Sequence, residues 1–239
     1  MKFAHVAATA LAVGALLAGC SPRHSSSRGY GSPASPGPGE GETSPRTTNR
    51  AAPTPSSAPD LDDWPTRPAT ADKFPRSIRS TALGENYTGT AYLGRLTQRW
   101  HIDLGARKKN DFNKNDDVPP VWYAAGTGRP SPGAKLTVAA VWDLSGDLES
   151  LTCTADRTAP GRTDFLRACI QLNYPRAQPT SAVRWLGKAL PDLDTAYAHT
   201  KKPEGSPLYR SGRAASYLLE YANGEEGLAY SLRIFGTAS

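Results

Sequence analysis

A histidine and an aspartate two residues apart, His101 and Asp103, come nearest to a catalytic pair in type and spacing. Side chains two apart on a strand point to the same face, so the carboxylate could orient the imidazole as a general base. The chain contains no Gly-x-Ser-x-Gly nucleophile turn, and Gly126-x-Gly128 lacks the third glycine of a phosphate-binding loop. A histidine held at the surface or in the core is the simpler explanation. We therefore predict a protein that is not an enzyme and needs no cofactor.

Oxygen-bearing side chains at alternate positions, Asp111, Asn113 and Asn115, resemble the start of a calcium-binding EF-hand loop. Asp116 stands where such a loop needs Gly, and Trp122 stands where it needs a bidentate Glu. This pattern favours a polar surface loop, and we predict no metal site. Acidic pairs are expected to be solvated charges in loops or turns at Asp116–Asp117, Asp192 with Asp194, and Glu225–Glu226.

The N-terminus has the composition of an export signal. Lys2 precedes an apolar, uncharged run at residues 6–17, shorter than the roughly 20 residues that span a bilayer. The run ends in Leu17-Ala18-Gly19-Cys20, which resembles the lipobox of bacterial lipoproteins. The resemblance implies cleavage between Gly19 and Cys20, a diacylglycerol with acyl chains such as palmitate on Cys20, and an extracytoplasmic protein held on the cell membrane. An ordinary secretory signal with a chance cysteine is the alternative.

The two other cysteines, Cys153 and Cys169, most simply pair with each other if the chain is exported beyond the reducing cytosol. Closing a loop of about 15 residues stabilises a fold by roughly 3 kcal/mol in the chain-entropy model. Two cysteines without a nearby histidine do not supply the four ligands of a structural zinc site. We predict a disulfide.

Composition divides the chain into three parts. Up to about residue 59 the segment after the signal is rich in Ser, Pro, Gly, Thr, Ala and Arg, so it cannot bury enough apolar surface to offset the entropy of ordering. A flexible chain of about 40 residues averages roughly 35 Å end to end. We predict a signal peptide at residues 1–19, the lipidated cysteine and a disordered tether at 20–75, and one globular domain at 76–239.

The charge of the chain is mildly basic, with a net charge of +6 and a pI of about 9.3. Lys and Arg are scattered, without the basic stripe or module typical of a nucleic-acid reader. We predict no nucleic-acid partner, and weak attraction to anionic envelope polymers stays open.

The hydrophobic pattern predicts strands, then helices, then strands. Alternation places strands at residues 90–104, 121–125, 135–142, 148–154, 214–221 and 227–235. Helical spacing begins at Thr163 and again at Pro179, and Pro191 is expected to end the second helix before a short turn. We therefore predict an α+β fold: an antiparallel sheet of about five to seven strands, two or three helices packed on one face, and one disulfide. Four tryptophans are expected in the core rather than in a glycan or lipid pocket: Trp100, Trp122, Trp142 and Trp185.

One region resembles the secreted subtilisin inhibitors of actinobacteria, on the residues Leu136-Thr137-Val138, Leu151-Thr152-Cys153, Pro160-Gly161 and Ala168-Cys169-x-x-Leu172. Residues 212–217 look like one of that family's C-terminal strands, and the likeness covers at most residues 134–236. It implies an antiparallel sheet with two helices. The family's second disulfide, which holds the protease-binding loop, has no counterpart after Cys169. By position alone, residues 201–208 are the candidate for the exposed loop that such an inhibitor would present to a protease.

Together these features predict a lipid-anchored cell-surface protein with a non-enzymatic binding domain. Its expected partners are the membrane, through the anchor, and an unidentified protein or envelope ligand. A subtilisin-inhibitor-like protease inhibitor is the alternative, and an envelope hydrolase that uses His101 and Asp103 is a remote one. The Gly-, Pro-, Ala- and Arg-rich usage is typical of an actinobacterium.

Overall fold

The computed structural model describes residues 61–75, 78–110, 119–222 and 227–237, which all belong to one unit, Thr54–Ser239. Several predictions fall outside the described residues. They concern the signal peptide, Cys20, the tether up to residue 60, the oxygen-rich residues 111–117 and the pair Glu225–Glu226.

Five long strands form the body of one antiparallel sheet, in the order β9-β10-β6-β5-β4. Their bounds are β4 (Val121–Ser131), β5 (Ala134–Trp142), β6 (Leu148–Asp156), β9 (Ala214–Ala222) and β10 (Leu228–Gly236). The sequence predicts all five strands, although it predicts β4 only over residues 121–125 and the first five residues of β9 are buried on both faces. The register shifts once between β4 and β5 and once between β5 and β6.

Five short strands extend this sheet to ten strands among the described residues. They are β1 (Ala69–Thr70), β2 (Asp103–Leu104), β3 (Lys108–Asn110), β7 (Glu204–Gly205) and β8 (Tyr209–Ser211). The prediction of five to seven strands is therefore too low. Segments of two or three residues are too short to show an alternating pattern, so the sequence does not reveal them.

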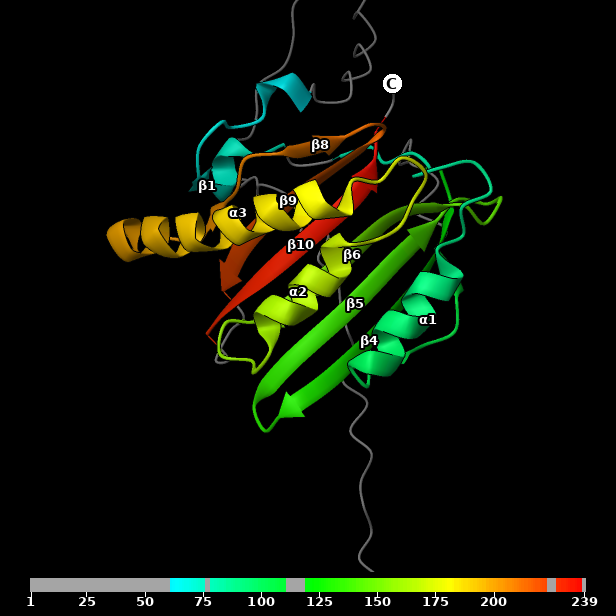
Figure 1. Ribbon diagram of the computed structural model, residues 1–239, viewed down its shortest axis with the longest axis horizontal. Helices are drawn as coiled ribbons and strands as arrows, with labels where there is room; N and C mark the ends of the chain where they lie inside the picture. Colours follow the sequence, from blue (N-terminus) through cyan, green and yellow to red (C-terminus); the bar gives the residue numbers. More distant parts are fainter. Residues whose placement is uncertain (1–60, 76–77, 111–118, 223–226, 238–239) are drawn as a thin grey trace, which may run out of the picture. The chain divides into compact units, whose positions relative to one another are not determined.

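Three helices pack on one face of the sheet, as Figure 1 shows: α1 (Thr90–Arg99), α2 (Arg162–Ile170) and α3 (Pro179–Thr200). The α+β class is confirmed. The prediction of strands over residues 90–104 is wrong for α1. Tyr92, Leu96 and Trp100 are four residues apart and therefore lie along one side of a helix. With Leu93, they pack in or against the core.

The helix predicted to end at Pro191 continues through it to Thr200. A proline inside a helix removes the hydrogen bond to the carbonyl four residues earlier, here that of Gly187. Both residues are exposed, so water can bind the freed carbonyl. The apolar side of α3 stays continuous across the proline, from Ala182 to Leu193, and its burial outweighs the lost bond.

The core lies between the helices and the sheet face that they cover. On β5 the side chains facing the helices are at most 3% exposed, at Ala134, Leu136, Val138, Ala140 and Trp142. The tryptophans take the predicted place: Trp142 is buried, while Trp100, Trp122 and Trp185 pack against the core from its margin. Trp100 also contacts the ring of Phe165, with centroids 5.4 Å apart.

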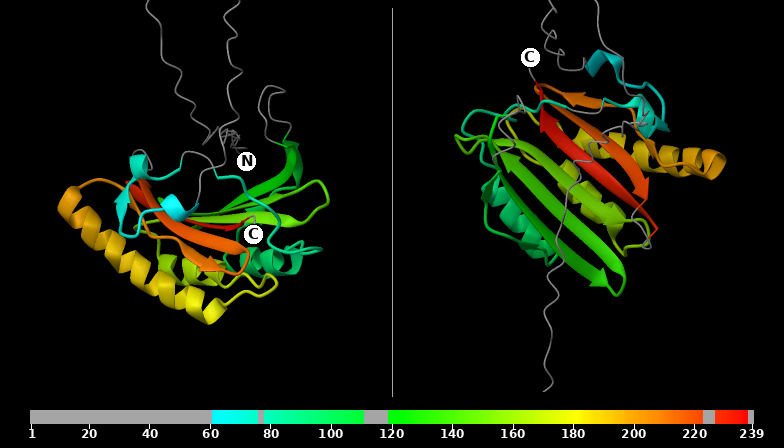
Figure 2. Two further views of the ribbon diagram at one scale, coloured as in Figure 1. Left: turned by 90° about the horizontal axis from the view of Figure 1, so that it is seen from above. Right: turned by 180° about the vertical axis from the view of Figure 1, so that it is seen from behind.

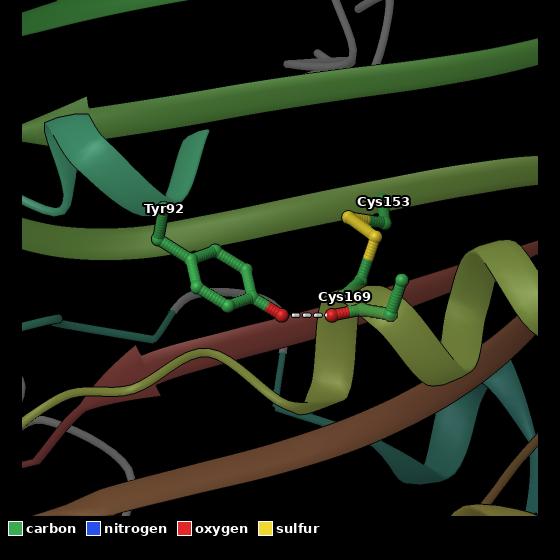
Figure 3. Close-up of a disulfide and its surroundings, with 4 residues drawn as sticks. Tyr92, Cys153 and Cys169 are labelled. Atoms are coloured by element: carbon green, nitrogen blue, oxygen red, sulfur yellow. Dashed lines mark hydrogen bonds between the residues drawn. A yellow bond between two sulfur atoms is a disulfide. The ribbon is translucent and has the colours of Figure 1, made fainter. Parts of the chain in front are cut away.

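The predicted disulfide is present and joins the sheet to α2. The sulfur atoms of Cys153 in β6 and Cys169 in α2 are within bonding distance, and both side chains are 0% exposed. One residue before Cys169, the carbonyl of Ala168 accepts a hydrogen bond from the hydroxyl of Tyr92 in α1 (Figure 3). α2 is thus attached both to the strand below it and to the neighbouring helix.

The first described residues lie on the other side of the sheet, over β9 and β10 (Figure 2). Trp64 is 6% exposed and contacts Phe74 and Tyr217, with ring centroids 5.1 and 4.9 Å away. Its indole N–H donates to the carbonyl of Ser206 at 3.1 Å. Residues 61–75, assigned to the tether by composition, therefore pack on the folded unit. The apolar side chains of residues 61–75 are too few and too far apart to form a periodic pattern, so the sequence alone does not assign this segment to the folded unit.

Candidate functional site

The proposed catalytic pair is not assembled. His101 follows the end of α1 in a turn, with a positive φ of 50°, and β2 begins only at Asp103. Both side chains are exposed, and within the described part of the chain no hydrogen bond or ion pair joins them. No group of three or more His, Cys, Asp or Glu side chains in the same part is arranged to hold a metal ion. The arrangement offers no oriented base.

A polar cluster that the sequence analysis missed lies where α3 crosses the ends of β6, β9 and β10. We call it the Glu220 cluster, and it comprises Arg157, Asp194, Glu204, Glu220 and Tyr230. The prediction that Asp192 and Asp194 lie in a loop is wrong, because α3 continues through both.

Glu220 is the most unusual member of this cluster. Its strand position faces the helices, opposite Tyr230 of β10, and the residue is 4% exposed. One carboxylate oxygen, Oε2, accepts from the backbone N–H of Glu204 at 3.4 Å, while Oε1 has no hydrogen-bond partner among the described residues. Burial raises the pKa of Glu220 to about 7, more than the Glu204 N–H and the charge of Arg157 lower it.

Asp194 holds the other half of the cluster together. It accepts from the guanidinium of Arg157 at 2.6 Å and from the hydroxyl of Tyr230. Burial and this hydrogen bond raise the pKa of Tyr230, so the hydroxyl keeps its proton and remains a donor. The guanidinium of Arg157 also lies over the ring of Tyr197, 5.1 Å from its centroid. The cluster thus ties α3 to the sheet.

The sequence held a signal for Glu220. Positions 216, 218 and 220 of β9 share the face that is buried under the helices. A carboxylate in an otherwise apolar alternation breaks the pattern, and buried charges are rare without a specific environment. Its partners come from residues 157, 194, 204 and 230, and only the fold brings those together.

A hollow of about 420 Å³ lies on the opposite side, beside Trp64. Its lining residues are Leu61, Asp62, Trp64, Pro65, Thr66, Pro207, Leu208 and Arg210. The two charged groups in it pair with each other, Arg210 with Asp62 at 2.7 Å. The hollow is therefore lined by both polar and apolar groups, and its two charged groups already pair with each other.

The sheet face opposite the helices carries a regular set of hydroxyl groups. Each pairs directly with the next across adjacent strands: Thr127 of β4 with Thr137 of β5, Thr137 with Thr154 of β6, and Thr154 with Ser231 of β10. We call these four residues the hydroxyl row. Thr127 is exposed and the other three are half-buried. Seen from behind, no described helix covers β4, β5 and β6 (Figure 2).

Small and polar side chains surround the hydroxyl row. The next row across the strands is Ala125, Ala139, Thr152 and Arg233. Tyr123, at the same face of β4, is 39% exposed. The surface over β4, β5 and β6 therefore offers several hydrogen-bonding groups among side chains of which few are bulky.

Residues 201–208, the positional candidate for an exposed loop, are exposed only at Lys201 and Lys202. Glu204 and Gly205 form β7, which pairs with β1 and β9, and Ser206 is 0% exposed. A substrate-like inhibitory loop has to be accessible to a protease. The centre of this segment does not meet that requirement, so the loop expectation is wrong there.

Among the described residues, no helix has the length and apolar character needed to cross a membrane. Compared with family models, curated proteins and solved structures, the chain has no match.

Proposed function

We propose that the chain is a lipid-anchored protein of the bacterial envelope whose domain binds a neutral, hydroxyl-rich polymer, an envelope glycan, through the hydroxyl row. The observation that carries this proposal is the register of four hydroxyl side chains across four adjacent strands. Each hydroxyl can donate one hydrogen bond and accept others, which suits the alternating donors and acceptors of a sugar chain.

Rigidity of the surface supports the same proposal. The four residues belong to the central strands of the sheet, so their positions are fixed before any ligand arrives. A preorganised surface loses little conformational entropy on binding. Tyr123 at its margin supplies an exposed ring, which can pack against the apolar side of a sugar.

The predicted anchor and tether give this binding surface its place. A lipid on Cys20 would hold the chain at the membrane, and a tether of about 40 residues would let the domain explore roughly 35 Å around it. The domain would then link the membrane to the polymer outside it.

Two variants of the full chain test the glycan surface. Thr137→Val and Thr154→Val keep the shape of the side chain and remove one hydroxyl each, so co-sedimentation with purified cell-wall glycan should weaken roughly 3- to 10-fold per substitution. The matched control is Thr163→Val, at an exposed threonine of α2. Unchanged binding in both row variants would refute the hydroxyl row as the binding surface.

The anchor has its own test. Mass spectrometry of the mature N-terminus should find Cys20 as the first residue, carrying diacylglycerol. Cys20→Ala should release the protein from the membrane fraction. A mature chain that begins elsewhere would refute the lipoprotein assignment and leave the glycan surface to be judged separately.

Protease inhibition is the second candidate function. The antiparallel sheet with its helices and the Cys153–Cys169 pair are the features that favour it. An inhibitor of this chain would have to offer the protease an exposed loop other than the centre of residues 201–208. Titration of subtilisin with the domain tests it: stoichiometric loss of protease activity with the domain uncleaved would establish inhibition, and full activity would remove it.

A further inference from the structure

The outer surface of the helix layer is basic. Its exposed cations are Arg95 and Arg99 on α1, Arg167 on α2, Arg184 and Lys188 on α3, and Arg176 in the connection between α2 and α3. Asp164 is the one exposed acidic residue on the three helices. Its carboxylate lies 3.3 Å from the guanidinium of Arg167, so it offsets the charge of Arg167 and of no other cation in this set.

Two like-charged pairs stand one helical turn apart, Arg95 with Arg99 and Arg184 with Lys188. Such spacing destabilises a helix by a small amount, so it brings no benefit to the fold itself. Among the ion pairs of the described residues, none involves any of these four cations. Arg95 and Arg99 lie over the rings of Tyr92 and Trp100, and no described ring lies under Arg184 or Lys188.

The position of Arg184 and Lys188 on α3 is fixed by the opposite side of that helix. Ala182, Leu186 and Leu193 are buried against the sheet and α2, which turns the two cations outward. α1, α2 and α3 form one layer over the sheet (Figure 1). Their cations therefore spread over a broad face, which matches an extended anionic surface better than a single small anion.

We propose that the outer face of the helix layer docks on anionic phospholipid headgroups of the membrane into which the Cys20 lipid is inserted. The proposal rests on the proposed anchor for its proximity to that membrane. The described chain starts at Leu61 on the far side of the sheet, and a helix layer on a sheet is roughly 20 Å thick. A tether averaging roughly 35 Å is long enough to pass around the domain.

Docking in this way has a functional consequence. The hydroxyl row lies on the sheet face opposite the helices, so it would point away from the membrane. The membrane would orient the glycan surface toward the polymer, in addition to holding it nearby.

Vesicle sedimentation tests the docking face. The full chain carrying Cys20→Ala is mixed with vesicles of equal parts phosphatidylglycerol and phosphatidylcholine, or of phosphatidylcholine alone, so that acylation cannot contribute. Each cation near an anionic surface strengthens binding about fivefold. The added double substitution Arg184→Glu/Lys188→Glu should therefore weaken binding to the anionic vesicles by at least about 25-fold.

The matched control is Arg129→Glu/Arg213→Glu, which changes the net charge equally at exposed positions outside the helices. It should weaken binding by less than about threefold, since charges away from the contact are largely screened by salt. Equal loss in both double variants, or no preference of the parent for anionic vesicles, would overturn the proposal.

The outcomes separate this proposal from the proposed function. If the helix variant alone loses vesicle binding, while mass spectrometry of the native chain finds no lipid on Cys20, docking is supported and the anchor is removed. A lipidated Cys20 and normal glycan binding, with no vesicle preference, would remove docking alone.

Discussion

The two faces of the sheet are built from the same strands and carry different chemistry. On β6, Leu151 and Cys153 are 0% exposed beneath the helices, while the neighbouring Thr152 and Thr154 point to the other side and stay half-buried. The helical face holds the stability of the domain in close packing. On the opposite face the apolar packing around Trp64 involves β9 and β10, so the hydroxyl face over β4, β5 and β6 contributes less apolar burial and is available to a ligand. Four variants and one control test this division.

The largest effect is expected on the helical face. Leu151→Ala removes a side chain that is 0% exposed and leaves a cavity, so it should lower the free energy of unfolding by about 3–4 kcal/mol. Urea unfolding followed by tryptophan fluorescence measures the change. A loss below about 1 kcal/mol would mean that the face under the helices is loosely packed and the comparison fails.

The disulfide belongs to the same face. Cys153 and Cys169 are 16 residues apart, and replacing both with Ala should cost about 3 kcal/mol because the unfolded chain regains the entropy of an open loop. Thermal unfolding of this variant should match that of the parent under reducing conditions. Parent stability that does not change on reduction would show that the bond constrains little.

Glu220 is a weak point of the helical face. Its pKa of about 7 lies above the ordinary value of 4.5, so the folded protein binds more protons than the unfolded chain between those pH values. Stability should fall as the pH rises from about 4.5 to 7 and level off above it. Glu220→Gln should remove this loss and stabilise the domain by about 2 kcal/mol at pH 8.

The control for Glu220 is Glu149→Gln. Burial also raises the pKa of Glu149, followed by the charge of Asp143, but this residue is half-buried. Its substitution should have a smaller effect. Equal pH dependence of the Glu220→Gln variant and the parent would place the titration elsewhere.

The smallest effect is expected on the hydroxyl face. Thr152→Ala, next to Leu151 in sequence, should change the free energy of unfolding by less than about 1 kcal/mol, because Thr152 is only half-buried and the change removes little apolar surface. The same urea titration as for Leu151→Ala gives the direct comparison. A cost as large as that of Leu151→Ala would show that something in the protein covers this face.

The sequence predicts the parts of the fold in which one face is buried and the other is not. The alternation of residues 135–142 identifies β5 almost to its ends, because burial along this strand alternates from each residue to the next. Residues 214–221 locate β9 equally well, although its first five residues are all buried. α1 was missed since aromatic and β-branched residues occur in both kinds of element, and the four-residue spacing of Tyr92, Leu96 and Trp100 carried the decisive information.

The candidate sites depend on contacts between distant residues. The Glu220 cluster joins positions 157, 194, 204, 220 and 230, and the hydroxyl row joins positions 127, 137, 154 and 231. A single sequence gives the residue at each position but not the strand order or the register. Both sites appear only once β10 is placed between β6 and β9.

That placement of β10 has a consequence for synthesis. β10 is the last described strand along the chain, yet it pairs with β6 on one side and β9 on the other. Until the ribosome has made residues 228–236, the growing chain has two open strand edges and cannot close its sheet. The complete sheet, with β6 and β9 joined through β10, therefore forms only when nearly the whole chain has been made.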